Sequence, residues 1–248
     1  MGRRTTRVGT IVLGRTKLKE QDLILTMMDT SGTQVRAVAK GARKPGSRLA
    51  ARTELFCECD MLLSWGRGLP IVQEAEVRNR HAHLSRDLEL VAAGSAMCEV
   101  ARLTCYEGIE DPYLYRILSR ALDALGEAST PQNVALLVSA YAIKVASHCG
   151  WRPEVDACVA CGEVSMARFS VAAGGVLCES CAKDIAEALP ITQAHVEWIA
   201  SLILSRFDVL ATCEVSQETS TFLVRLAHSW CATHLDARLR AFEFYAGL

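Results

Sequence analysis

The segment Thr33-Gln-Val-Arg-Ala-Val-Ala-Lys-Gly-Ala-Arg-Lys-Pro-Gly-Ser-Arg-Leu-Ala-Ala-Arg52 decides how the first part of the chain folds. Val35, Ala37 and Ala39 alternate with their neighbours at the period of two that indicates a half-buried strand. Residues 41–52 then concentrate Gly, Pro and Arg, which predicts a loop. Four further apolar runs, bounded by turn residues, flank this segment: 7–15, 22–29, 54–65 and 69–77. Five short strands of this kind predict a small β barrel or sandwich.

Beyond residue 80 the apolar residues recur with the period of a helix instead. Thr130-Pro131, for example, combines an N-cap residue with a proline at the first helical position. Helices are predicted over residues 84–106, 111–122, 130–148, 192–210 and 217–245. The sequence therefore predicts an α+β, multi-domain chain. Residues 1–80 are expected to form a five-stranded β domain, and residues 81–248 are expected to form an all-α domain interrupted by a cysteine-rich segment at 154–181.

The charge is distributed unevenly, although the net charge of the whole chain is only −1. Residues 1–52 contain twelve Lys and Arg against three acidic residues, a net charge of +9, and the rest of the chain has −10. An excess of this size in a short segment favours contact with a polyanion. A solvated basic surface without a ligand is the alternative.

Four of the eleven cysteines form two Cys-x-x-Cys pairs, Cys158 with Cys161 and Cys178 with Cys181. Two sulfur atoms three residues apart bind one ion when the chain turns tightly, and Gly162 permits such a turn. Four thiolates form the closed tetrahedral shell of a structural zinc, so we predict one bound Zn²⁺. A redox-active pair, an iron centre of the rubredoxin type and buried thiols are the alternatives.

The other seven cysteines are interpreted as structural. Cys57 and Cys59 share one face of a strand, because the side-chain period of a strand is two. The remaining five are expected to pack as small apolar side chains on helices: Cys98, Cys105, Cys149, Cys213 and Cys231.

Neither a signal peptide nor a membrane span is predicted. No apolar stretch follows the charged N-terminal residues, and no run of eighteen apolar residues occurs. We therefore expect a cytoplasmic protein, and in a reducing cytosol paired cysteines are metal ligands more often than disulfides.

No catalytic constellation is recognisable in the sequence. Residues 41–47 half resemble a phosphate loop, but Ser47 stands where its lysine belongs and Pro45 removes a backbone donor. The acidic residues are scattered, and Glu74 and Glu76 alternate along a strand as on a solvated face. We therefore expect that the protein is not an enzyme. An enzyme with a diffuse active site, such as a nuclease, is the alternative.

The basic residues of the barrel favour binding of nucleic acid. Loops and one strand face hold single strands in oligonucleotide/oligosaccharide-binding (OB) barrels. Two places offer cations: the connection after the first strand, and the third strand with the loop that follows it. The candidate DNA-binding residues are Arg15, Lys17, Lys19, Arg36, Lys40, Arg43, Lys44, Arg48 and Arg52. Only Phe56 and Trp65 are available for stacking, so we expect contacts mainly to phosphates, with little sequence specificity.

Several short stretches carry a resemblance to one known family. They include Gly9-Thr-Ile-Val-Leu-Gly-Arg, Ala39-Lys-Gly-Ala-Arg and Gly150-Trp-Arg-Pro with Cys158-Val-Ala-Cys and Cys178-Glu-Ser-Cys. On these motifs the chain resembles the RecO family of bacterial DNA repair and recombination mediators over essentially its whole length. The resemblance implies an OB-fold barrel followed by a helical domain with an inserted zinc finger of four cysteines.

The same resemblance implies a function and partners. It implies binding of single- and double-stranded DNA, annealing of complementary strands, and help in loading RecA onto single strands coated with single-stranded-DNA-binding protein (SSB), in the RecF pathway. The implied protein partners are RecR and the C-terminal tail of SSB. No contact with a membrane is expected, and the expected location is the cytoplasm, in association with the nucleoid. Candidates for binding the acidic SSB tail are Lys144, Arg152, Arg116 and Arg120. A zinc-ribbon/OB protein of RNA metabolism is the alternative.

Overall fold

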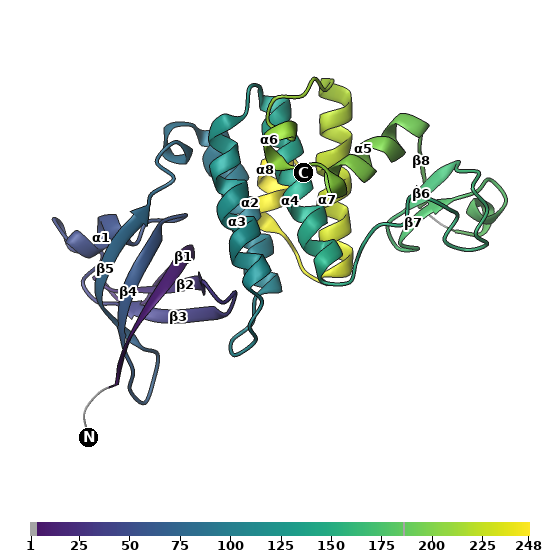
Figure 1. The fold of residues 1–248 in the computed structure, drawn as a ribbon. Helices are drawn as coiled ribbons and strands as arrows, with labels where there is room; N and C mark the ends of the chain where they lie inside the picture. The colour runs from purple at the N-terminus through teal and green to yellow at the C-terminus, as the bar shows by residue number, and fades with distance from the viewer. Residues whose placement is uncertain (1–3, 186) are drawn as a thin grey trace. The chain divides into compact units, whose positions relative to one another are not determined.

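The structure is a computed structural model that describes residues 4–185 and 187–248 (Figure 1). The chain divides into two compact units, one up to Gly126 and one from Glu127. The strands of the first unit are β1 (Thr5–Lys17), β2 (Leu23–Asp29), β3 (Gln34–Ala39), β4 (Glu58–Ser64) and β5 (Ile71–Asn79). Its helices are α1 (Arg48–Arg52), η1 (Leu84–Arg86), α2 (Leu88–Thr104) and α3 (Pro112–Ala124), and η2 (Leu125–Glu127) spans the division.

The five strands form one closed sheet in the order β1-β2-β3-β5-β4, because β4 pairs with β1 as well as with β5. Along β2, Leu23, Leu25 and Met27 are buried while the residues between them are half-buried, as a strand with one face in a core requires. Met61 and Leu63 of β4 complete this core. The predicted α+β class is confirmed: a five-stranded sheet precedes the helices, and the cysteines cluster.

Several predicted boundaries in this unit were wrong, three of them for reasons that the structure shows. The first strand continues past Arg15 to Lys17, because both residues stay in the ladder with β2. Strand β4 begins four residues later than expected, since Phe56 has φ +71° and turns the chain. The end of the predicted loop 41–52 is helix α1, whose first turn is capped by Ser47 Oγ accepting from Ala50 N at 3.4 Å.

A buried carboxylate joins α3 to the barrel. Glu58 of β4 accepts hydrogen bonds from His81 Nε2 at 3.0 Å, from Tyr115 Oη at 3.1 Å and from Ser119 Oγ at 2.7 Å. Burial alone would raise the pKa of Glu58, but the hydrogen bonds from His81 and Ser119 outweigh it and hold the pKa below its usual range. On its other side, His81 Nδ1 lies 3.0 Å from Asp123 Oδ1. This network explains why α3 belongs to the same compact unit as the strands.

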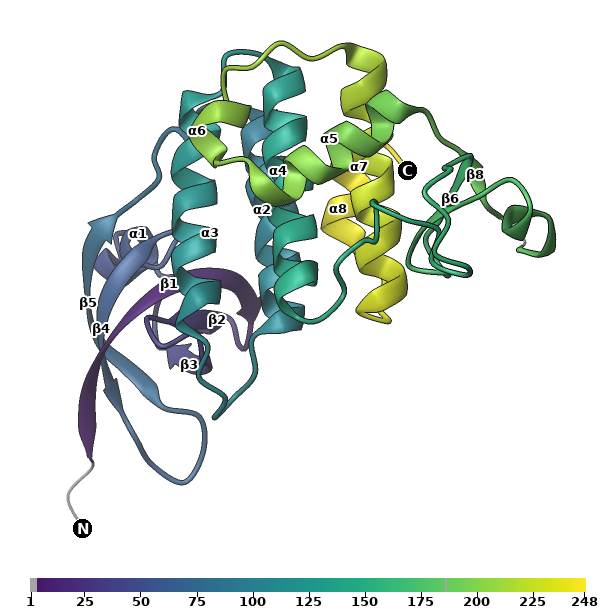
Figure 2. The same cartoon turned by 45° about the vertical axis from the view of Figure 1, so that its right-hand side comes forward.

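The second unit contains the helices α4 (Pro131–His148), α5 (Gln193–Leu204), α6 (Phe207–Leu210), α7 (Gln217–His234) and α8 (Arg240–Ala246). Helices α4 and α7 run alongside each other in both views (Figure 2). The predicted start of α4 is confirmed, because Thr130 Oγ1 accepts from Asn133 N and Pro131 is the first helical residue.

Three predicted helices are not continuous. Residues 84–106 form η1 and then α2, which begins at Leu88. Asp87 is the N-cap residue between them, and its carboxylate accepts a hydrogen bond from Glu89 N at 2.7 Å. The helix predicted over 192–210 stops at Ser205, which is extended at φ −72° and ψ 147°, and α6 follows. The helix predicted over 217–245 ends at His234, and a turn with Asp236 at φ +47° precedes α8.

The division between domains near residue 80 stays a prediction. The last barrel strand ends at Asn79, whereas the compact units divide after Gly126. Among the helices of residues 4–185 and 187–248, none has both the length and the hydropathy needed to cross a bilayer.

Candidate metal centre and nucleic-acid interface

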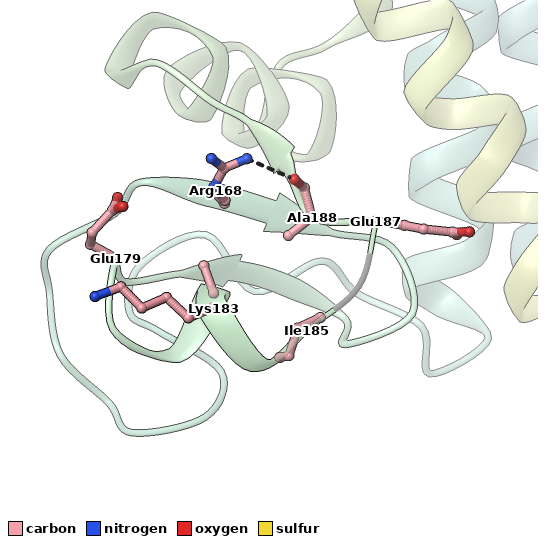
Figure 3. Close-up of a pocket in the computed structure, with 7 residues that line it drawn as sticks. Arg168, Glu179, Lys183, Ile185, Glu187 and Ala188 are labelled. Carbon is pink, nitrogen blue, oxygen red and sulfur yellow. Dashed lines mark hydrogen bonds between the residues drawn. The ribbon is translucent and has the colours of Figure 1, made fainter.

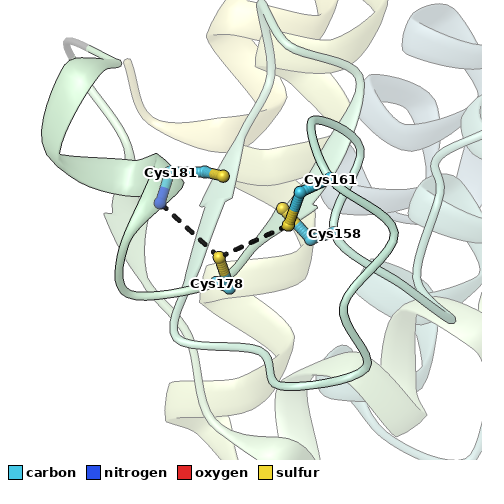
Figure 4. Close-up of side chains that lie close together, drawn as sticks. All are labelled: Cys158, Cys161, Cys178 and Cys181. Atoms are coloured by element: carbon cyan, nitrogen blue, oxygen red, sulfur yellow. Dashed lines mark hydrogen bonds between the residues drawn. The ribbon is translucent and has the colours of Figure 1, made fainter.

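The four cysteines of the two pairs lie together (Figure 4). Their Sγ atoms are all within 4.8 Å of one another, and Cys161 Sγ is 3.8 Å from Cys178 Sγ. Cys158 and Cys178 are buried, Cys181 is half-buried and Cys161 is exposed. The structure therefore brings together the four residues that the spacing alone suggested.

Two tight turns place the sulfur atoms. After Cys158 the chain folds back so that Gly162 N donates to Cys158 O at 2.8 Å, and Gly162 has φ +78°, as its predicted role in a turn requires. After Cys178, Ala182 N donates to Cys178 O at 3.0 Å in the same way. The framework is a three-stranded sheet of β6 (Arg168–Ser170), β7 (Gly175–Leu177) and β8 (Leu189–Pro190), with η3 (Cys181–Asp184) after the second turn.

The donor set fits a tetrahedral metal ion. Metal–sulfur bonds of about 2.3 Å place neighbouring sulfur atoms of a tetrahedron about 3.8 Å apart, which matches the separation of Cys161 and Cys178. Hydrogen bonds from the backbone of Cys178 lower the pKa of Cys158 to about 6, whereas contacts with Cys161 and Cys178 raise the pKa of Cys181 to about 12. A bound cation is what would allow all four to be thiolates at once. The cluster can therefore hold one metal ion.

The cysteine segment is attached to α7 of its own unit by aromatic residues. His234 Nε2 lies 3.1 Å from Val171 O, and Trp230 packs against Phe169 with ring centroids 5.8 Å apart. A hollow of about 290 Å³ near the cluster is lined by Arg168, Glu179, Ala182, Lys183, Ile185, Glu187 and Ala188 (Figure 3). Its lining mixes both signs of charge, and Arg168 Nη1 donates a hydrogen bond to Ala188 O at 3.1 Å.

Most of the other cysteines are placed as predicted. Cys59 Sγ lies 3.4 Å from Cys57 Sγ in the barrel core, and Cys98, Cys105 and Cys231 are buried. The prediction was wrong for two residues: Cys149 is exposed at the end of α4, and Cys213 is half-buried in the turn after α6.

All nine candidate DNA-binding residues are exposed. None of them forms a salt bridge with another residue of the part of the chain that the structure describes. In contrast, Arg7 faces Glu74 and Glu76, and Arg78 faces Asp60. The two acidic residues Glu74 and Glu76 are exposed, as predicted for a solvated face.

The structure brings the loop after β3 against the β1–β2 connection. Asp22 Oδ1 accepts from Gly41 N at 2.8 Å, and Arg43 N donates to Gln21 O at 3.0 Å. Arg43 Nη1 also donates to Lys19 O at 3.1 Å and to Glu20 O at 2.8 Å. The cations of these two segments therefore form one basic end of the barrel, which we call the basic end: Lys17, Lys19, Lys40, Arg43 and Lys44.

Three further candidates are outside the group named the basic end: Arg15 on β1, Arg36 on β3 and Arg52 on α1. In the register of β1, β2 and β3, Arg15 is opposite the inward Leu25, whereas Arg36 is opposite Thr26, so the pleat directs them to different faces. Arg52 donates to Ala75 O at 3.0 Å and lines a hollow of about 460 Å³. The other residues of that hollow are Arg7, Glu74, Ala75, Glu76, Val77 and Arg80. Arg52 is thus in a mixed-charge setting.

The candidates for the SSB tail are divided between the two compact units. Arg116 and Arg120 are on α3 of the first unit, and Lys144 and Arg152 are in the second. Lys144 Nζ donates to Ile203 O at 2.6 Å and lies 5.9 Å from the centre of the Phe207 ring. Burial lowers the pKa of Lys144, and its contacts indicate a structural role.

Sequence reasoning did not identify the Glu58 network. Glu58, His81 and Ser119 are far apart in the chain, and an acid in a strand otherwise resembles the exposed Glu74 and Glu76. The place of Glu58 between Cys57 and Cys59, at the start of an apolar run, was a sequence signal that this acid could lie inside.

Both parts of the chain match models of known protein families. Residues 3–81 match the family described as Recombination protein O N terminal, and residues 85–242 match Recombination protein O C terminal. A DNA repair protein RecO of Bifidobacterium longum (strain DJO10A) is 32% identical over 234 residues, covering 93% of this chain and 94% of the relative. One of Desulforudis audaxviator is 30% identical over 236 residues (94% and 93%), and one of Bifidobacterium animalis subsp. lactis is 39% identical over 171 residues (68% and 70%). The chain therefore belongs to the RecO family.

Proposed function

We propose that this protein is a DNA-binding recombination mediator in DNA repair. It binds and anneals DNA strands, and it helps to load RecA onto SSB-coated single strands in the RecF pathway. The basic end of the barrel is the observation on which the proposal mainly rests, because its exposed lysines have no acidic partners among the described residues. Membership of a family whose curated members are named DNA repair proteins supports the same conclusion.

The barrel is assigned the OB fold in this proposal. The strand order β1-β2-β3-β5-β4 with closure by β1 and β4 is the topology that OB folds use. In such barrels the loop between the first two strands and the loop between the last two flank the bound strand. Lys19 lies in the first of these loops, and the loop after β3 is bound to it through Asp22 and Arg43. The cations are therefore at the end where a single strand is expected.

The metal in this proposal is one structural Zn²⁺ bound by Cys158, Cys161, Cys178 and Cys181. Four sulfur ligands leave no open position for a substrate or water, so the ion stabilises the segment and does no chemistry. The protein itself is proposed to act without catalysis, as a mediator. RecR and the SSB tail are its proposed protein partners, and the nucleoid-associated cytoplasm is its proposed location.

Annealing of SSB-coated complementary strands, with and without the protein, tests this function. A labelled strand and its complement are each saturated with SSB, and duplex formation is followed with time. We expect the protein to accelerate annealing, whereas an unchanged rate would contradict the proposal. Phosphate contacts alone do not distinguish DNA from RNA, so RNA is added as a competitor at fixed salt. Preferential binding of RNA over single-stranded DNA would favour a role in RNA metabolism instead.

A further inference from the structure

The two aromatic residues available for stacking in the barrel sequence differ in exposure. Phe56 is only 6% exposed and its ring lies close to Gly94 of the same unit, so it is part of the core. Trp65 is 40% exposed and follows the last residue of β4 directly. Trp65 is therefore the aromatic ring of the barrel that is accessible to a ligand, and its amphipathic ring suits a contact surface.

The position of the Trp65 ring is fixed by the barrel. The indole Nε1 donates a hydrogen bond to Thr6 Oγ1, and the Trp65 backbone N donates to Arg4 O at 2.9 Å. Both partners belong to the start of β1 and the residue before it. The N–H group of the indole thus has a hydrogen-bond partner within the protein, and this bond restricts rotation of the ring. A ring ordered in this way loses little conformational entropy when a flat ligand stacks on it.

The surroundings of Trp65 are basic. Arg4 and Arg67 are exposed, and neither forms a salt bridge with any residue in the described part of the chain. Leu69, at the other side of the β4–β5 turn, is 38% exposed and adds apolar surface. A flat apolar ring in a segment that also carries exposed arginines suits a ligand that combines π faces with negative charge.

The β4–β5 turn also lies beside the strand that leads into the basic end. Val38 N donates to Pro70 O at 2.8 Å, and Val38 pairs with Ile71 at the start of β5. Lys40 follows only two residues after Val38. The end of the turn that carries Trp65 and Arg67 is therefore close in the sheet to Lys40, which belongs to the basic end. One strand of nucleic acid that contacts the basic end can continue towards this turn.

We propose that Trp65 is a stacking platform for an unpaired base, and that it makes this surface prefer single-stranded over double-stranded DNA. The inference rests on the proposed DNA-binding function and specifies one site within it. Phosphates bound by the lysines are present in both forms of DNA, so these contacts do not distinguish them. In a duplex each base is already stacked between its neighbours and paired, whereas a base of a single strand is free to stack on Trp65.

The test compares Trp65→Ala and Trp65→Phe with the unchanged protein on three ligands of equal length. These are an oligo(dT) strand, an abasic strand with the same phosphates, and a duplex. We expect Trp65→Ala to weaken binding of oligo(dT) about tenfold and to leave binding of the abasic strand and the duplex unchanged. Trp65→Phe keeps a ring face and should recover most of the loss. Tyr106→Ala is the matched control, since Tyr106 is an exposed aromatic residue (58%) of the same unit.

The outcomes separate this inference from the proposed function. Equal affinity of Trp65→Ala and the unchanged protein for oligo(dT) would overturn the platform while leaving DNA binding intact. An equal loss on all three ligands would also overturn it, because it would indicate a disturbed barrel, which the melting temperature of each variant checks. Failure of the unchanged protein to bind any of the ligands would instead refute the proposed function itself.

Discussion

The cysteine segment and the basic end of the barrel are built in different ways. Each metal-binding pair spans four residues, and turns within those residues set the positions of its sulfur atoms. The cations come from separate segments that only the barrel and the contact of Arg43 with Lys19 bring together. A local site of this kind depends on every one of its residues, whereas a distributed basic surface loses little when one cation is removed. Substitutions should therefore affect the two regions very differently.

The largest effect is expected for the cysteines. Cys158→Ser with Cys178→Ser removes one ligand from each pair and both buried sulfur atoms. Structural zinc contributes on the order of 10 kcal/mol of binding free energy to small zinc modules, so the metal should be lost and the melting temperature should fall by at least about 5 °C. Metal content by mass spectrometry and thermal unfolding measure this.

The annealing activity that remains in the double cysteine variant shows whether the two regions act independently. Annealing should partly survive, because the barrel belongs to the other compact unit. Cys213→Ser is the matched control, since its sulfur lies outside the cluster. Full metal content in the double variant would contradict the assigned ligands, and complete loss of annealing with a folded barrel would contradict the structural role.

The next largest effect is expected for the basic end and its loop. Lys40, Arg43, Lys44 and Arg48, all replaced by Glu, change the local charge by eight units and should weaken binding of single-stranded DNA by at least about 100-fold. Annealing should be abolished while metal content stays unchanged. Reversal of Arg225 and Arg240, which are exposed on the second unit, is the control for a general charge effect. Unchanged annealing in the fourfold variant would refute the assigned surface.

A smaller effect is expected for Glu58, which contributes to the stability of the first unit and is not part of the basic end. Glu58→Gln removes the charge from a side chain that is 11% exposed and faces His81 at 3.0 Å. A hydrogen bond to a charged group typically contributes about 2 kcal/mol, and urea unfolding measures the loss. Glu76→Gln is the matched control, because its exposed pair with Arg7 should contribute less than about 1 kcal/mol. Equal stability of the two variants would show that the buried network does not hold the unit together.

The lowered pKa of Glu58 predicts that the stability of the folded protein depends on pH. Because the pKa of Glu58 is lowered in the folded protein, its contribution is complete above the ordinary range for glutamate, about pH 4.3. This contribution is lost as the pH falls through the lowered folded pKa. The unchanged protein should therefore lose stability more steeply on acidification than Glu58→Gln does.

The sequence predicted those features that depend on neighbouring residues. The alternation in β3, the Thr130-Pro131 helix start and the two cysteine turns are all set by a few adjacent side chains. The short helix α1 and the breaks after Leu204 and His234 were missed. Five residues give no helical period, and neither break contains Gly or Pro. His234 ends its helix where it contacts Val171, more than sixty residues earlier.

The candidate sites show the same limit. All nine cations are exposed, as expected for a binding surface, yet the sequence did not show that Arg15 and Arg36 point to different faces or that Arg52 is beside Glu74. These relations come from strand register and closure of the barrel, which no single segment determines. The Glu58 network was missed for the same reason.

The salt dependence of single-stranded DNA binding tests the central claim most directly. If the barrel neutralises about five phosphates, log affinity should fall against log salt with a slope near −3.5. The measurement uses oligo(dT) and the unchanged protein over a range of salt concentrations at fixed pH. A slope near this value is the result that the basic end predicts, and an affinity that does not change with salt would contradict it.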